Sequence, residues 1–95
     1  MPNTGTINVI RENKFKGAII PFNVFIDGQY VGELTNGQQL SFPVYLGHHV
    51  VSFKTEKEVI QEVDITEQSL NVYINVNCKM ELLMGRPKVI NVYYG

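Results

Sequence analysis

The 95-residue sequence contains a single cysteine, Cys78, no long apolar run and no excess of charge of either sign. One cysteine excludes an intrachain disulfide and a zinc site made of four cysteines. Eight basic and nine acidic residues give a net charge of −1. This balance favours neither a nucleic-acid-binding protein nor one drawn to an anionic membrane surface.

The sequence also lacks a segment that would carry it into a membrane. The N-terminal stretch MPNTGTINVIRENKFKG has no apolar core of the kind found in secretory signals, and no later segment approaches transmembrane length. We therefore expect one soluble domain, residues 1–95, which is cytoplasmic as the sequence stands. An envelope location is expected instead if the chain was cut from a longer protein.

Helical periodicity is absent as well, and alternation of apolar and polar residues takes its place. The clearest case sets Leu70, Val72, Ile74 and Val76 against Asn71, Tyr73, Asn75 and Asn77. The pattern predicts strands at residues 5–11, 21–27, 29–34, 38–44, 48–54, 59–65, 70–77, 78–84 and 88–94. Eight or nine short strands are typical of an all-β, antiparallel two-sheet sandwich, and a small closed barrel is the alternative.

Turn residues separate these segments. Asp27-Gly28, Asn36-Gly37 and Gly47 can supply the positive φ angles that hairpins require. Gly85-Arg86-Pro87 is expected to break the strand that begins at Cys78. Pro43 cannot donate a ladder hydrogen bond, so its strand is predicted to lie at a sheet edge.

The motif VFIDGQYVG at residues 24–32, followed by Gly47-x-His49-x-Val51, resembles PEGA-type domains. These are small bacterial β-sandwiches, and the resemblance extends over residues 5–76. The Pro-containing linker of that family is replaced here by Leu34-Thr35-Asn36-Gly37, and the chain is more similar to an uncharacterised group of small bacterial proteins with the same hairpin. The resemblance implies an accessory interaction module rather than an enzyme.

The residues that most often carry chemistry are scattered. His48 and His49 are adjacent, so on a regular strand they point to opposite faces and cannot chelate one metal ion together. We expect His49 at the margin of the core, bonded to a backbone group of the Asp27-Gly28 turn, with a functional imidazole as the alternative. Cys78 is in phase with Met80 and Leu82, which predicts burial as a small apolar residue.

The carboxylates are predicted not to form a catalytic pair. Asp27 is expected to bond the backbone two residues on within its turn. The remaining acidic candidates fall on solvent faces: Glu33, Glu62, Asp64 and Glu67. No nucleophile elbow, phosphate-binding glycine loop or metal-ligand spacing is present in the sequence. The sequence thus predicts no enzyme, no catalytic residue, no metal and no cofactor.

A short basic segment holds Arg11, Lys14 and Lys16 around Phe15. A nucleic-acid site is one interpretation of such a cluster. We favour a strand edge or loop that its lysines protect against aggregation, because the rest of the chain is slightly acidic.

The outward row Asn71, Tyr73 and Asn75 is the one candidate binding surface, which Asn91, Tyr93 and Tyr94 would extend if the last strand is adjacent. Such a face is a solvated surface, a protein interface rich in Tyr, or a platform for a sugar ring. We predict a noncatalytic interaction module that binds a protein partner or itself, through this face or by β-addition to the first or last strand. The alternative is a domain that binds carbohydrate or an envelope polymer.

Overall fold

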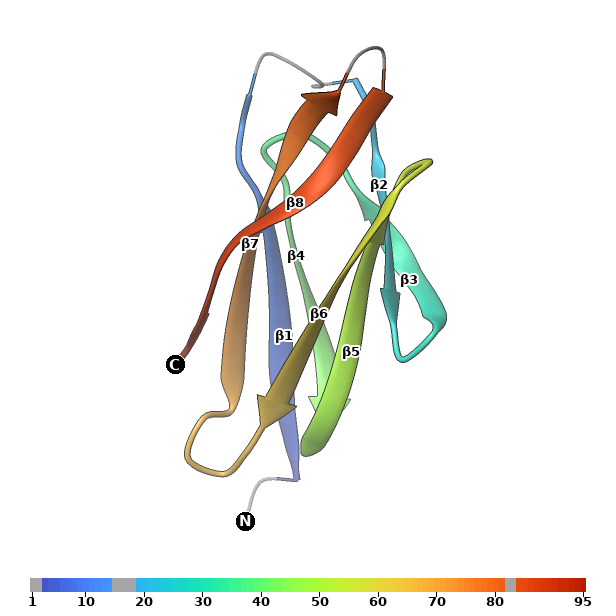
Figure 1. The fold of residues 1–95 in the computed structure, drawn as a ribbon. Helices are drawn as coiled ribbons and strands as arrows, with labels where there is room; N and C mark the ends of the chain where they lie inside the picture. The colour runs from blue at the N-terminus through green and yellow to red at the C-terminus, as the bar shows by residue number, and fades with distance from the viewer. Residues whose placement is uncertain (1–2, 15–18, 82–83) are drawn as a thin grey trace.

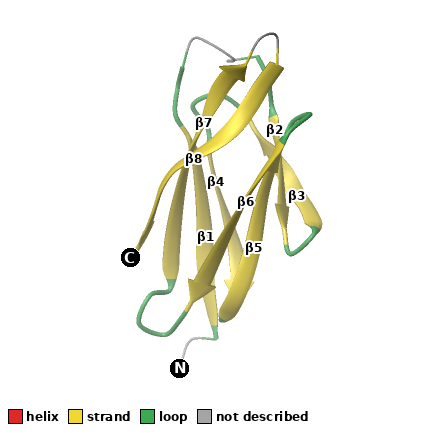
Figure 2. Cartoon of the chain, in the orientation of Figure 1, coloured by secondary structure: helices red, strands yellow, loops and turns green. Residues whose placement is uncertain are grey.

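The computed structural model describes residues 3–14, 19–81 and 84–95, and these form eight strands in two sheets of four (Figure 1). Sheet A has the order β4-β1-β7-β8 and sheet B the order β3-β2-β5-β6. The strands are β1 Thr4–Arg11, β2 Phe22–Ile26, β3 Gln29–Leu34, β4 Gln39–Tyr45, β5 Gly47–Lys54, β6 Glu58–Ile65, β7 Asn71–Glu81 and β8 Met84–Tyr94. Within the described ranges there is no helix and no closed barrel, so the predicted all-β sandwich is confirmed (Figure 2).

One strand pair departs from the predicted antiparallel arrangement. β1 and β7 run parallel in the middle of sheet A, whereas the other neighbouring strands are antiparallel. The segment after β6 connects sheet B to sheet A. As a result β7 pairs with β1, and not with β6, which precedes it in the sequence. Periodicity identifies a strand but not its neighbour, and so the direction of this pair was not predicted.

The three turns predicted from Asp27-Gly28, Asn36-Gly37 and Gly47 all have positive φ, but only the first closes a hairpin. Asp27 and Gly28, with φ of 52° and 82°, connect β2 to β3 within sheet B, as predicted. Asn36-Gly37 and Gly47 instead lead the chain between the sheets, because β3 and β5 belong to sheet B and β4 to sheet A. A residue with positive φ is found both in hairpin turns within a sheet and in connections between two sheets. The sequence therefore does not show which of the two a given glycine turn makes.

The predicted break at Gly85-Arg86-Pro87 is wrong. These residues lie inside β8, and residues 71–77 and 78–81 are one continuous strand, β7. A proline is tolerated in β8 because this strand lies at the edge of sheet A. Pro43 lies on the other edge strand, β4, and that prediction is confirmed. Leu82 is outside the described residues.

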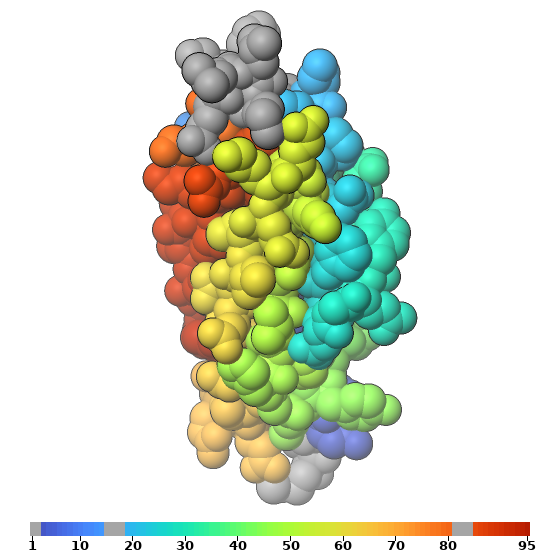
Figure 3. All heavy atoms as spheres, turned by 45° about the vertical axis from the view of Figure 1, so that its right-hand side comes forward, coloured from blue at the N-terminus to red at the C-terminus, as the bar shows by residue number. Residues whose placement is uncertain are grey.

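The core lies between the two sheets and follows the predicted alternation. Sheet A contributes five fully buried side chains: Ile7, Val9, Val72, Ile74 and Val76. Sheet B contributes others of the same kind: Phe22, Val24, Leu34, Val51 and Phe53. In Figure 3, β6 runs between β8 on one side and the β2–β3 hairpin on the other. Among the described residues, no helix is long and apolar enough to cross a membrane.

One charged side chain is part of this core. Arg11 is only 1% exposed, and its Nη1 donates hydrogen bonds to the carbonyl oxygens of Ile20 at 2.5 Å and Leu34 at 3.0 Å. Its guanidinium lies 3.9 Å from the centroid of the Phe22 ring, a cation–π contact. The predicted basic edge is therefore wrong for Arg11, because β1 is a central strand. Lys14 is exposed, while Phe15 and Lys16 lie outside the described residues.

Candidate functional site

The predicted binding row forms a continuous patch on the outer face of sheet A. Tyr73 of β7 pairs with Tyr93 of β8, and their rings stack with centroids 4.8 Å apart and planes 11° apart. Asn75 pairs with Asn91, and its Nδ2 donates a hydrogen bond of 2.6 Å to Asn91 Oδ1. We call the set Asn71, Tyr73, Asn75, Asn91 and Tyr93 the Tyr–Asn surface.

The polar row continues toward the centre of the sheet. Asn8 of β1, next to Tyr73 in register, is buried and its Nδ2 donates to the carbonyl of Val72. Ser41 Oγ of β4 donates to Asn8 Oδ1 at 2.6 Å. Side-chain hydrogen bonds thus join β4 to β1, β1 to the backbone of β7, and β7 to β8, which helps to hold the Tyr–Asn surface in a defined arrangement.

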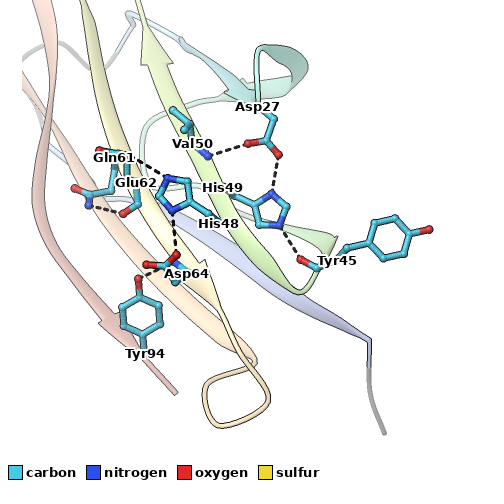
Figure 4. Close-up of polar contacts among 9 residues, drawn as sticks. All are labelled: Asp27, Tyr45, His48, His49, Val50, Gln61, Glu62, Asp64 and Tyr94. Carbon is cyan, nitrogen blue, oxygen red and sulfur yellow. Dashed lines mark hydrogen bonds and ion pairs between the residues drawn. The ribbon is translucent and has the colours of Figure 1, made fainter.

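Tyr94 does not belong to this surface. It pairs with the buried Val72, and its hydroxyl accepts a hydrogen bond of 3.1 Å from the backbone N–H of Asp64 in β6. Its ring therefore bridges β8 to the edge of sheet B (Figure 4). Of the three residues expected to extend the row, Asn91 and Tyr93 do so.

β8 also presents backbone groups away from the sheet. Asn71 and Gly95 exchange both backbone hydrogen bonds, so ladder alternation makes Tyr73–Tyr93 a hydrogen-bonded pair and Ile74–Val92 a non-bonded one. The N–H and C=O of Val92 consequently face away from β7, on the side where sheet A has no further strand among the described residues. Of the two strands predicted for β-addition, β8 is an edge, whereas β1 is not.

A second cluster surrounds the two histidines, which point to different sides of β5 (Figure 4). His48 Nδ1 lies 2.9 Å from Asp64 Oδ1, and Nε2 lies 3.0 Å from Glu62 Oε1. Hydrogen bonds to Asp64 and then Glu62 raise the pKa of this exposed imidazole above its ordinary value. The two carboxylates occupy opposite nitrogens of one ring, and the described residues contain no group of three or more acidic, His or Cys side chains suited to a metal ion.

His49 lies at the core margin, as predicted, but its partner in the hairpin differs. Its Nδ1 is 2.6 Å from the Asp27 carboxylate rather than bonded to a backbone group, and its Nε2 is 2.7 Å from the Tyr45 carbonyl oxygen. Asp27 Oδ1 accepts the backbone N–H of Val50 at 2.9 Å, so the carboxylate bonds the backbone within β5 and not that of its own turn. The hydrogen bond from His49, followed by that from Val50, lowers the pKa of Asp27.

The ion pairs of His48 with Glu62 and Asp64 could not be predicted from the sequence. Glu62 and Asp64 are both on a solvent face of β6, as predicted, but their gathering around His48 depends on the β5–β6 register, in which His48 pairs with Asp64. Glu33 and Glu67 are exposed and lie apart from this cluster. The two acidic residues at alternate positions, Glu62 and Asp64, were the available signal, although this spacing does not identify the strand that faces them.

A shallow hollow of about 340 Å³ opens beside His49, between the edges of the two sheets. Its apolar lining comes from Ile26, Val31, Phe42 and Val44, and its polar lining includes Asp27, Gln29 and His49. Both ring nitrogens of His49 already face oxygen acceptors, so accepting a proton from a substrate would require breaking one of these contacts. Cys78 is half-buried and packs against the core, less enclosed than predicted.

No protein-family model, no curated protein and no solved structure matches this chain.

Proposed function

We propose that this chain is a noncatalytic interaction module that binds a protein, a second copy of itself included, by adding a strand to the edge of β8. The outward-facing backbone groups of Val92 carry this proposal, because an extended strand can pair with such an edge. The Tyr–Asn surface borders the same edge and supplies the aromatic and amide groups that are frequent in protein interfaces. Pro43 makes the opposite edge, β4, a poorer template.

The local geometry is compatible with this proposal. Ile90 lies at the irregularity in the β7–β8 register and is 46% exposed, although it belongs to a strand with a buried face. Arg86 and Lys88 are exposed near the start of β8, where charges limit unspecific edge pairing and leave the segment from Ile90 to Tyr94 as the pairing region. The resemblance to PEGA-type modules is consistent with a binding role, and the residues that carry it, Asp27 and His49, are in contact.

Ile90→Lys is expected to abolish self-association through β8, because it places a positive charge inside the pairing segment of each copy, and a lysine on an edge strand opposes strand addition. Light scattering over a concentration series measures the effect. Ile60→Lys is the matched control, since Ile60 is 56% exposed on β6 and lies on the other sheet. A wild-type protein that stays monomeric, or two variants that lose association equally, would contradict pairing of two copies through β8.

A carbohydrate or envelope polymer is the second candidate ligand, favoured by the register of the Tyr–Asn surface. Tyr73 and Tyr93 cover one ring face of each other. The uncovered ring faces could contact a sugar ring, and the amides of the Tyr–Asn surface could bond its hydroxyls.

Tyr73→Ala is expected to reduce glycan binding on an array by about two- to tenfold, since an aromatic stacking contact contributes about 0.5–1.5 kcal/mol. Tyr30→Ala is the control, because Tyr30 is 54% exposed but belongs to sheet B. Equal losses in the two variants, or no glycan bound by the wild type, would exclude this surface as a sugar site.

A further inference from the structure

His49 connects three parts of the chain at one end of the sandwich. It belongs to β5, its Nδ1 contacts Asp27 in the β2–β3 turn, and its Nε2 contacts the carbonyl of Tyr45 where β4 ends (Figure 4). Tyr45 lies in sheet A, whereas Asp27 adjoins sheet B. Only 13% of the His49 side chain is exposed, whereas its partner Asp27 is half-exposed.

Both partners of His49 can only accept hydrogen bonds. A carboxylate oxygen faces one ring nitrogen at 2.6 Å and a carbonyl oxygen faces the other at 2.7 Å. Only the imidazolium carries a proton on each nitrogen. A neutral ring that keeps its proton on Nδ1, next to Asp27, directs the Nε2 lone pair at the Tyr45 oxygen, and this contact then becomes repulsive.

We infer that His49 is a proton-dependent lock, which holds the β4–β5 corner against the β2–β3 turn while its ring is an imidazolium and releases the Tyr45 side when the ring loses a proton. The corner is suited to movement because Gly47 adopts a φ of 128°, a conformation with few steric restraints for glycine. The hollow lined by Val31, Phe42 and Val44 borders the same corner, so release would expose these apolar side chains further.

The polar and charged groups around His49 determine whether its pKa is raised or lowered. Burial lowers the pKa of His49, but the hydrogen bonds to Asp27 and to the Tyr45 carbonyl, together with the charge of Asp27, outweigh burial and leave this pKa raised. The neighbouring His48 lowers the pKa of His49, and His48 is itself paired with Glu62 and Asp64 of β6. Opposite His49 on β6 is the uncharged Val63, and the hydroxyl of Tyr94 from β8 is bonded at Asp64, the next residue of β6.

The sign of the pH dependence follows from this raised pKa. A group that binds its proton more tightly when folded stabilises the fold fully below its unfolded pKa, about 6.5 for His, and loses that contribution as pH rises through the folded pKa. Asp27 acts in the opposite range, because its lowered pKa stabilises the fold above about 3.8 and the effect is lost on further acidification. The lock is therefore closed in mildly acidic solution and opens toward alkaline pH.

NMR titration of the wild-type protein tests the lock directly. The ring Cε1–H of His49 is expected to titrate with a midpoint above about 6.5, and the amide signals of Leu46 and Gly47 should shift with the same midpoint. A His49 midpoint at or below that value, or corner amides that do not follow it, would overturn the inference.

Two variants separate the histidines. His49→Gln should remove the midpoint from the corner amides and flatten the fall in the thermal unfolding temperature between pH 6 and pH 8. His48→Gln, the adjacent control, should keep that midpoint and move it upward, because a positive neighbour is lost. If His48→Gln flattens the profile and His49→Gln does not, the exposed pair with Glu62 and Asp64 carries the pH dependence and the lock is refuted.

Discussion

Arg11→Ala is expected to lower the free energy of unfolding by about 3 to 5 kcal/mol, as measured by urea denaturation. Two carbonyl oxygens, of Ile20 and Leu34, lose a charged donor, and each such hydrogen bond contributes about 1.5–3 kcal/mol. The contact with the Phe22 ring is lost as well, and a cavity is left in the core. Since small domains are stable by about 5–15 kcal/mol, the variant should be largely unfolded at moderate urea concentrations.

Two further variants show that the effect comes from the guanidinium at this position. Arg11→Lys keeps the charge but loses the planar fork that serves two carbonyls, and it should lie between wild type and Arg11→Ala. Lys14→Ala, in the same basic segment, should change stability by less than about 0.5 kcal/mol because Lys14 is exposed. An Arg11→Ala protein as stable as wild type would show that Arg11 is not a structural part of the core.

Gly5→Ala is expected to destabilise the protein by about 3 kcal/mol, at the upper end of the usual cost of overpacking. A methyl group on Gly5 would collide with the backbone carbonyl oxygen of Leu70 and lie 2.5 Å from Ile65 Cγ2. The carbonyl cannot move aside easily, because it accepts the backbone N–H of Thr6 at 2.8 Å. The strain therefore falls on the contact between β1 and the start of β7.

Thermal unfolding of Gly5→Ala and Thr4→Ala tests this argument. Thr4 is the adjacent residue and is exposed, so its replacement by alanine should leave the unfolding temperature nearly unchanged. If the two variants unfold at similar temperatures, the close approach of Gly5 to Leu70 is not a constraint on the fold. Mass spectrometry of the intact proteins would confirm that each sample carries the single intended change.

The candidate surface was predictable because it depends mainly on alternation. Asn71, Tyr73 and Asn75 share the outer face of β7, and the structure adds Tyr93 and Asn91 through the β7–β8 pairing. The edge position of β8 was also predicted, whereas the interior position of β1 was not. The contact of His49 with the Asp27-Gly28 turn was predicted, although it is made to the Asp27 carboxylate and not to a backbone group. The contact of His49 with the Tyr45 carbonyl escaped prediction, because Tyr45 ends a strand of the other sheet.

Arg11 illustrates the same limit within the core. Its position is in phase with Ile7 and Val9, so the inward direction of the side chain could have been derived from the sequence. A buried arginine requires acceptors, however, and these come from Ile20 and Leu34, which are distant in the chain from one another. The lysines nearby made a surface interpretation the simpler one.

The sequence by itself determined the strands, the apolar residues that fill the core and the tight turn at Asp27-Gly28, since these depend on period-two alternation and on local φ preferences. Tertiary structure alone decided which sheet each strand joins, the parallel β1–β7 pair, the continuation of β8 through Pro87, and the partners of Arg11 and His49. The physical reason is that the backbone N–H and C=O groups of a strand bond to other strands, and its side chains contact residues of those strands. Their partners are therefore chosen by register and by sheet exchange across the whole chain, which no short window of sequence contains.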